Sequence, residues 1–587
     1  MADMNAALLA LGLVPLLVVC SVGPGLLVVR GLRWSPVEKL CGAMAASFIL
    51  LYLASFVLFC FNAPLSGYWC AAGLFALAGV INTHQMVVLV RFHQSRRVLI
   101  AFAAILAWDF LHLAMIRSYS GGLWGGDWYE HYERTCYFLH QHSNSFRYLT
   151  IYLLPARPPM MNAIIAFFGR LVGMNGNKLS FESYSLCCVF LNAFAFLPCC
   201  LLLRHFAHGG MRYVYVLAIL FMLNPSIMEN VTWTITKAFA AGFVVLGVCF
   251  YLRGLRGKEP TRIIAAAIFL AGGCLVHYSA VPFAMGIAVH YLWVLATKRR
   301  GLLEPMIASL AGAALMASWF GWAIAHFEMH DTFFSNSTAT GTVKLTTGEN
   351  IVKILENLFT SLVPHPLSPI ATGLFSRMQN LGDVRDYFFM MAQTTLPMMI
   401  GSASGLLAIY LFLFKKWPDY RERRFWLFFV PFTFILATAT NPELERYGAG
   451  HIASQSLATM GVALVTAWLM EARGWVFWCV MAGLLVDYIF GVLLQFHLES
   501  RVHKVVADPR GRRVIRDFSL GTPGFYQYLE KLRMGFVFWG DHFAGASLVF
   551  QTLSIVVAAG AFAWLMRMRP SYVVALARER RVRRYHF

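Results

Sequence analysis

Charged residues are scarce in this sequence. Only 13% of its 587 residues are Asp, Glu, Lys or Arg, whereas soluble proteins carry about 25%. Hydrophobic residues make up 59% of the chain, and the mean hydropathy is +0.62. The sequence also lacks low-complexity linkers and any soluble domain of ordinary size. These features exclude an ordinary soluble protein and favour a protein that crosses a membrane many times.

The motifs of nucleotide and metal binding are missing as well. No GxGxxG or GxxxxGK[ST] stretch opens a helix after a strand, so no nucleotide-binding fold is expected. The twelve cysteines contain no CxxC pair or other metal-ligand spacing. Most of them lie inside apolar runs, where they are expected to pack as small apolar residues. No metal site is predicted, although the sequence leaves open whether a divalent cation is required.

Apolar runs of about 20 residues recur along the chain, and each could cross a hydrocarbon core of about 30 Å. The first run, from Ala6 to Val29, is too long for a cleaved signal peptide and is expected to be retained. Basic clusters separate successive apolar hairpins, and the positive-inside rule places these clusters in the cytoplasm. The prediction is an all-α polytopic membrane protein with about 15 spans, an outer N-terminus and a cytoplasmic C-terminus.

The net charge of +20 does not call for a nucleic-acid partner. Under this topology, the cytoplasmic loops and tail hold 28 of the 48 basic residues but only 7 of the 28 acidic ones. The net positive charge therefore lies on one side of the membrane. There it acts as an orientation signal and can contact anionic lipids.

This topology divides the chain into three regions. Residues 1–97 are expected to form N-terminal transmembrane helices, residues 98–470 the central module, and residues 471–587 further transmembrane helices with a basic cytoplasmic tail. The central module contains outer loops at 118–180 and 326–387. The last region contains an outer segment at 497–543 that is too polar to cross and is expected to form a small helical cap.

One apolar segment of the first outer loop is not expected to cross. "RPPMMNAIIAFFGRLVGM" (Arg157 to Met174) is short, contains Arg170 and begins with a Pro pair that suits a helix N-terminus. It is therefore predicted to be a helix that lies at the outer surface.

Side chains able to do chemistry gather in a few polar stretches, which the topology places at the outer ends of helices. Nothing comparable lies on the inner side apart from basic loops. A site built on one face from distant parts of the chain suits a substrate taken from the outer leaflet. The stretches are "GGDWYEHYERTCYFLH" (125–140), "LLPARPPMMN" (153–162), "NPSIMENVTWTITK" (224–237), "VHYSAVPF" (276–283) and "NPELERYGAGH" (441–451).

The candidate catalytic residues are two acids in the first stretch. Asp127 and Glu130 lie three residues apart, on one face if this stretch is helical. A carboxylate there can take a proton from a hydroxyl nucleophile, and a second can orient the acceptor or hold a divalent metal. Arginine, lysine and histidine in the other stretches suit a phosphate group. The candidates for binding the donor phosphate or substrate are Arg157, Arg446, His277, Lys237, His131, Tyr447 and His451.

Structural roles compete with these functional ones. Lys237 and His277 lie at helix ends, where such residues often snorkel or cap. Aromatic residues near a membrane surface commonly form an anchoring belt, so those of the first stretch need not stack on a sugar. Asp109 and His112 lie one turn apart within the fourth apolar run, and they are interpreted as satisfying each other; Asp487 is likewise interpreted as structural.

The stretches together resemble the GT-C superfamily of membrane glycosyltransferases. The resemblance is to its polyprenyl-phosphate-sugar branch, which includes protein O-mannosyltransferases and lipid A aminoarabinose transferases. It rests on an outward Asp-containing stretch directly after a membrane helix and on "RPPMMNAIIAFF" about thirty residues later. "LVHYSAVPF" and "ERYGAGH" lie where such enzymes have helix ends that line the donor pocket. The resemblance covers roughly Val98 to His451.

The resemblance implies a GT-C-like helix bundle and an activity. Asp127 would be the catalytic base, supported by Glu130. Some members have an adjacent Asp-Glu pair, whereas here Trp128 and Tyr129 intervene. Arg157 would bind the donor phosphate and Arg446 would be a second contact.

The implied reaction moves a sugar from a polyprenyl-phosphate donor to the hydroxyl of a glycan, lipid or protein acceptor. It would occur at the periplasmic face of the inner membrane and would invert the anomeric configuration.

Two other functions stay open from the sequence. A lipid-linked oligosaccharide polymerase or ligase would rely on a late outer loop, for which Arg501, His503 and Arg512 are suitable. A lipid-linked-sugar transporter or flippase would bind and move its substrate without chemistry. Transporters often contain inverted repeats and helices interrupted at mid-membrane, and the sequence shows no such repeat.

Overall fold

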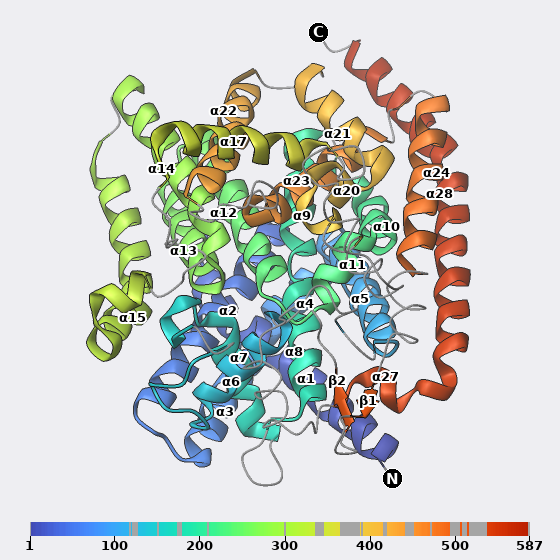
Figure 1. Cartoon of the computed structure of the whole chain (residues 1–587). Coiled ribbons are helices and arrows are strands. Elements are labelled where there is room, and N and C mark those ends of the chain that lie inside the picture. The colour runs from blue at the N-terminus through green and yellow to red at the C-terminus, as the bar shows by residue number, and fades with distance from the viewer. Residues whose placement is uncertain are drawn as a thin grey trace.

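Helices make up nearly all of the described part of the protein (Figure 1). The computed structural model describes residues 2–116, 119, 127–148, 152–172, 179–207, 210–298, 301–334, 345–363, 388, 391–414, 420–440, 451–469, 472, 474–492, 505–507, 513–515 and 537–584. At some of these positions, including 127 and 451–453, only the backbone is described.

The elements follow one another along the chain as α-helices, short 3-10 helices (η) and one pair of strands. They are α1 (Ala2–Val29), α2 (Pro36–Cys60), α3 (Leu65–Ile81), α4 (Thr83–Arg91), α5 (His93–Leu113), α6 (Asp127–Phe138), η1 (Leu154–Ala156), α7 (Met160–Val172), α8 (Phe181–Ala193), α9 (Phe196–Phe206), η2 (Gly210–Tyr213), α10 (Val214–Leu223), α11 (Pro225–Thr232), α12 (Lys237–Gly257), α13 (Pro260–Val276), η3 (Tyr278–Ala280), α14 (Val281–Lys298), α15 (Leu303–Phe334), α17 (Thr347–Leu362), α20 (Leu396–Ile400), α21 (Ser402–Phe414), α22 (Tyr420–Thr440), α23 (His451–Leu469), α24 (Gly474–Gly491), β1 (Val505–Ala507), β2 (Arg513–Ile515), α27 (Trp539–His542), η7 (Ala544–Ala546) and α28 (Ser547–Arg584).

Eight of the described helices are long and apolar enough to cross a membrane. Two bent helix pairs, α3 with α4 and α10 with α11, raise this number to ten if each pair is one span. The all-α, multi-pass architecture expected from the sequence is therefore confirmed, whereas the count of about 15 spans is not. The predicted topology counts several shorter helices as crossings. The apolar parts of these helices have fewer than 18 residues, as in α13, α21 and α23.

The bend between α10 and α11 has a clear chemical cause. Asn224 ends α10, and its side-chain oxygen accepts a hydrogen bond from the backbone N–H of Ile227, so it caps α11. Pro225 follows at the first helical position, where its missing N–H is tolerated. The Asn224 amide also donates to the carbonyl of Met399, which ties the bend to α20. The chain direction bends by 76° between the two helices.

Close helix packing depends on small residues at the crossing of α1 and α2. The backbone N–H of Gly25 donates to the hydroxyl of Ser47 at 2.8 Å. A Cβ atom added at Gly25 would overlap the carbonyl group of Ala43. The two backbones can therefore approach this closely only because position 25 has no side chain.

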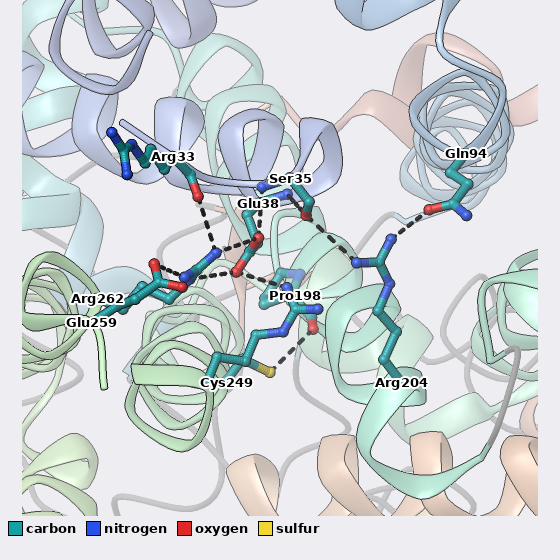
Figure 2. Close-up of polar contacts among 10 residues, drawn as sticks. Arg33, Ser35, Glu38, Gln94, Pro198, Arg204, Cys249, Glu259 and Arg262 are labelled. Carbon is teal, nitrogen blue, oxygen red and sulfur yellow. Dashed lines mark hydrogen bonds and ion pairs between the residues drawn. The ribbon is translucent and has the colours of Figure 1, made fainter. Parts of the chain in front are cut away.

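A buried ion network joins α2, α12 and α13 (Figure 2). Glu38, in the first turn of α2, accepts a hydrogen bond from Nε of Arg262 at 2.9 Å, and Nη1 of Arg253 lies 2.7 Å from the same oxygen. Its other oxygen accepts from the backbone N–H of Ser35 in a capping box. Because the partners come from three helices, this carboxylate fastens helix ends together.

The two ends of the bundle contain different elements. In Figure 1, α6, α7, α27 and the two strands lie towards the end with the N-terminus, and the C-terminus lies at the opposite end. The segment at 497–543 was expected to be a helical cap. Its described residues include a two-stranded antiparallel pair, Val505–Ala507 with Arg513–Ile515, as well as α27. Valine and isoleucine at these positions favour strands, so the expectation of a purely helical cap was wrong.

Two expectations about buried polar groups have different outcomes. The carboxylate of Asp487 in α24 accepts a hydrogen bond from the backbone N–H of Ser402 at 2.8 Å, so it caps α21 and is structural. His112 bonds the carbonyl of Trp108 at 2.7 Å, and Oδ2 of Asp109 has no hydrogen-bond partner among the described residues. His112 therefore does not satisfy this oxygen of Asp109, contrary to what had been expected from the sequence. All twelve cysteines are free and nine are buried, as expected for packing residues.

Candidate active site

The first polar stretch forms a buried helix, α6. Its twelve residues begin at Asp127, so positions 127 and 130 do lie one turn apart on one face. The side chain of Asp127 lies outside the described residues. The carbonyl of His131 accepts a hydrogen bond from the amide of Asn162 at 2.8 Å, which fixes α6 against α7.

The helix α7 is present where the sequence predicted a non-crossing helix, but it is not exposed. Nearly all of its side chains are buried, against α6 and α2 among others. The Pro pair directly precedes Met160, as expected for a helix start. The neighbouring helices, rather than the outer surface, therefore cover this apolar segment.

Glu130 is the centre of a buried ion cluster. Its side chain has no exposed surface. Its Oε1 atom accepts from Nε and Nη2 of Arg134 at 2.9 and 2.7 Å, one turn along α6. Nε of Arg157 lies 3.5 Å from the same atom, and Nη2 of Arg157 donates to Oε2 at 3.5 Å. One carboxylate therefore positions two guanidinium groups from different segments.

The electrostatics of the cluster keep Glu130 ionised. Burial alone would raise its pKa, but the charges of Arg157 and Arg134 outweigh burial and lower the pKa to about 2. A carboxylate with such a low pKa is a poor general base. Burial lowers the pKa of the adjacent His131 to about 3, so this ring is neutral at physiological pH.

Backbone and aromatic groups hold the two arginines in place. Arg134 donates to the carbonyls of Leu154 and Leu153 in the turn of η1, and its guanidinium lies 4.3 Å from the ring centroid of Tyr148. Arg157 follows η1 in an extended conformation. Arg134 thus fastens the segment of η1 to α6, and the residue that follows η1, Arg157, lies beside Glu130.

A third segment reaches Arg157 through Tyr278. Nη1 of Arg157 donates to the Tyr278 hydroxyl at 2.9 Å, and the guanidinium lies 5.4 Å from the ring of Tyr278 and 5.8 Å from that of Tyr152. His277 caps the short helix η3, since its Nδ1 accepts from the backbone N–H of Ser279 at 3.1 Å. The His277 ring also packs on Tyr278 at 4.1 Å. His277 therefore helps to position Tyr278.

The stretch at 224–237 contacts the start of α6. The Thr234 hydroxyl donates to the carbonyl of Trp128 at 3.1 Å. Asn192 braces the following turn by donating to the carbonyl of Ile235 and accepting from the backbone N–H of Phe239. Lys237 is the first residue of α12, just beyond this turn, and is partly exposed. Four of the polar stretches are thus connected around α6.

The remaining candidates cannot be placed. Arg446 and Tyr447 lie outside the described residues, as do Arg501, His503 and Arg512 of the alternative polymerase or ligase site. His451 is the first residue of α23, and its side chain is outside the described part. The structure therefore joins Glu130 and Arg157 directly, with His131 and His277 flanking them.

Sequence reasoning missed Tyr278, Tyr152 and the part played by Arg134. Tyr278 is adjacent to the candidate His277, and that adjacency was the available signal. The aromatic residues of the first stretch were considered for sugar stacking. Trp128 instead packs against Tyr119, Phe181 and Phe538 with 7% of its surface exposed, and so belongs to the core.

A divalent cation does not fit the described part of this cluster. Within the described residues, no group of three or more His, Cys, Asp or Glu side chains is placed to hold a metal ion. The Glu130 oxygens are already occupied by two arginines, whose positive charges would repel a cation.

The fold and the site define a multi-pass helical membrane protein with a buried acid–arginine cluster at one end of its helices. No family model and no curated protein matches the sequence. Two solved structures are similar, both of ArnT from Cupriavidus metallidurans. The structure bound to undecaprenyl phosphate has a TM-score of 0.45 with 15% identity, and the apo state has 0.43 with 15%.

Each match covers 82% of this chain and 76% of the other. At this identity and TM-score, the matches do not decide the activity, and the function proposed below rests on the site.

Proposed function

We propose that the protein is a GT-C-type membrane glycosyltransferase that moves a sugar from a polyprenyl-phosphate donor to an acceptor hydroxyl. The observation that carries the proposal is the placement of Arg157. Its guanidinium is 9% exposed and is held by Glu130 and Tyr278 at the junction of three polar segments. A fixed planar cation of this kind is suited to a phosphate group.

Asp127 is the residue proposed as the general base. It begins α6, one turn before Glu130, and the stretch at 224–237 contacts the same end of the helix. In the proposed reaction, Asp127 takes a proton from the acceptor hydroxyl as this oxygen attacks the anomeric carbon. The bond between that carbon and the phosphate oxygen breaks, and the polyprenyl phosphate leaves with the electron pair. A single displacement of this kind inverts the configuration.

The proposal assigns Arg157 to the departing phosphate, where negative charge develops. Glu130 has another role, because its low pKa and its two arginine partners make it a positioning residue. Tyr278 restrains the other side of the Arg157 guanidinium. The reaction would take place at the periplasmic face, since the site belongs to loops that the charge pattern places outside.

The test is transfer of labelled sugar from polyprenyl-phosphate donors by purified protein. Asp127→Asn should lower kcat by about 10²- to 10⁴-fold while donor binding stays intact, because only a proton acceptor is lost. Arg157→Gln should weaken donor binding about tenfold or more, because a charged hydrogen-bonding partner of the phosphate is lost. Glu130→Gln should mainly raise the KM for the donor by releasing Arg157.

The matched control is Asp331→Asn, which removes a carboxylate that is 48% exposed near the end of α15. This variant should transfer sugar at the wild-type rate. If wild type neither binds nor consumes a polyprenyl-phosphate sugar across a panel of sugars, the proposal is wrong. Movement of the intact lipid across a vesicle membrane without product would instead identify a transporter.

A further inference from the structure

A large cavity lies far from the Glu130 cluster, between α12, α14 and α22. Its volume is about 1140 Å³. The three helices contact one another, and α14 and α22 lie on the side of the molecule towards the C-terminus (Figure 1). The cavity is therefore a separate site, formed where these helices end or begin.

The cavity wall is strongly basic at its mouth. Arg256 and Lys258 come from the end of α12, and Arg421 and Arg424 come from the first two turns of α22. Among the described lining residues, Glu422 is the acidic one; it is buried and bonds Arg256, and its Oε1 lies 3.0 Å from Nδ1 of His205. The described lining residues of this mouth are therefore four cationic side chains and one carboxylate, so the described lining is basic.

The deeper wall is apolar and aromatic. Leu252, Phe425, Phe428, Val289 and Trp293 line it. Position 252 lies six residues before Lys258, and position 428 lies seven residues after Arg421. At 1.5 Å per residue, the lining follows each helix for about 10 Å. The lining therefore changes from charged to apolar over a distance that matches the length of a lipid headgroup and its first acyl carbons.

The side of the cavity formed by α14 has exposed apolar side chains. Val289 is 41% exposed and Trp293 is 54% exposed. The helix itself is apolar enough to span a membrane. An amphiphile could therefore enter laterally, with its acyl chains remaining against apolar side chains.

Lys258 adopts a backbone conformation that points to a role beyond ending the helix. It is the C-cap of α12 with φ 51° and ψ 41°, in the left-handed region. This region favours glycine, which is the usual residue at such a position. A lysine here is unfavourable for the backbone, but it adds a cation to the mouth of the cavity.

We propose that this cavity binds the headgroup of an anionic glycerophospholipid. Lys258, Arg421 and Arg424 contact the phosphate, and the acyl chains lie along Phe425, Phe428 and Trp293. Basic pockets between transmembrane helices on the cytoplasmic side are known to suit such lipids, and the charge pattern places these helix ends on that side. The site is independent of the proposed sugar transfer.

The test measures lipid retention by native mass spectrometry of the full-length protein. Phosphatidylglycerol should bind at least tenfold more tightly than phosphatidylcholine with the same acyl chains. Lys258→Gly and the double variant Arg421→Gln/Arg424→Gln should each lower phosphatidylglycerol affinity, the double variant by about tenfold. The melting temperature of Lys258→Gly should stay unchanged or rise, because glycine adopts the left-handed backbone conformation without steric strain.

The matched control is Arg91→Gln/Arg96→Gln, which removes two exposed arginines of α4 and α5 on the same predicted side, outside the cavity. It should bind phosphatidylglycerol like wild type. Equal binding of the two lipids, or wild-type retention by both cavity variants, would overturn the proposal. Displacement of the lipid by millimolar inorganic phosphate would also overturn it, since the site would then recognise a free anion.

Discussion

The strongest energetic consequence of the structure concerns Glu130, whose carboxylate lies between two buried arginines. Glu130→Gln keeps the shape of the side chain but removes its charge, and Arg134 and Arg157 are only 2% and 9% exposed. Breaking a buried ion pair by removing one partner destabilises a protein by about 3–5 kcal/mol, because the remaining charge is left uncompensated. We therefore expect Glu130→Gln to lower the free energy of unfolding by this amount.

A double-mutant cycle separates this effect from general damage. Arg134→Met should also destabilise, since it leaves the buried Glu130 with one cation fewer. Glu130→Gln/Arg134→Met should lose about 1–3 kcal/mol less than the two single changes together, because the two side chains are in contact.

Denaturant titration of the purified protein in micelles gives the free energies, with Asp331→Asn as a surface control expected within about 0.5 kcal/mol of wild type. Additive single effects, or a Glu130→Gln variant as stable as wild type, would refute the account of the cluster.

Three further changes test other parts of the structure. The pKa of His131 falls from 6.5 to about 3 on folding, so the unfolded chain binds a proton that the folded protein does not, and stability falls as pH drops below 6.5. At pH 5 this effect lowers the free energy of unfolding by about 2 kcal/mol. Denaturant titrations at pH 5 and 7 should therefore show a smaller pH dependence of stability in His131→Gln than in wild type. Gly25→Val should lower stability by about 1–3 kcal/mol through its clash with Ala43; a wild-type melting temperature would contradict this. Trp539→Phe removes the Nε1 donor to the carbonyl of Glu182 and should speed hydrogen exchange in residues 537–546, and unchanged exchange would show that this bond does not hold α27.

The sequence was most informative where a pattern repeats. Apolar runs of span length predicted the helical membrane architecture because each run must satisfy its own backbone hydrogen bonds in lipid. Helix breaks were harder to predict, because they depend on tertiary partners. Glu328 adopts φ 65° inside α15, and nothing in the apolar pattern marks that position. The burial of α7 likewise depends on α6 and α2 covering it.

In the candidate site as well, the roles of single residues depend on tertiary contacts that the sequence pattern does not reveal. The spacing of Asp127 and Glu130 predicted that they share a helical face, and α6 confirms the helix. The spacing alone could not show that Glu130 is ion-paired. That depends on Arg157, 27 residues further along the chain, and on the wrapping of η1 around Arg134. Tyr278 was missed for the same reason, since its hydroxyl reaches Arg157 only after α13 has been packed into place.

The geometry of α6 also explains how neighbouring acids can have different roles. Arg134 follows Glu130 by four residues, the spacing at which helical side chains meet, so the helix itself pairs Glu130 and lowers its pKa. The residue four positions after Asp127 is a histidine, His131, which burial keeps neutral. A proton acceptor needs a pKa closer to the working pH than Glu130 has. The proposed mechanism therefore assigns the positioning role to Glu130 and the base role to Asp127.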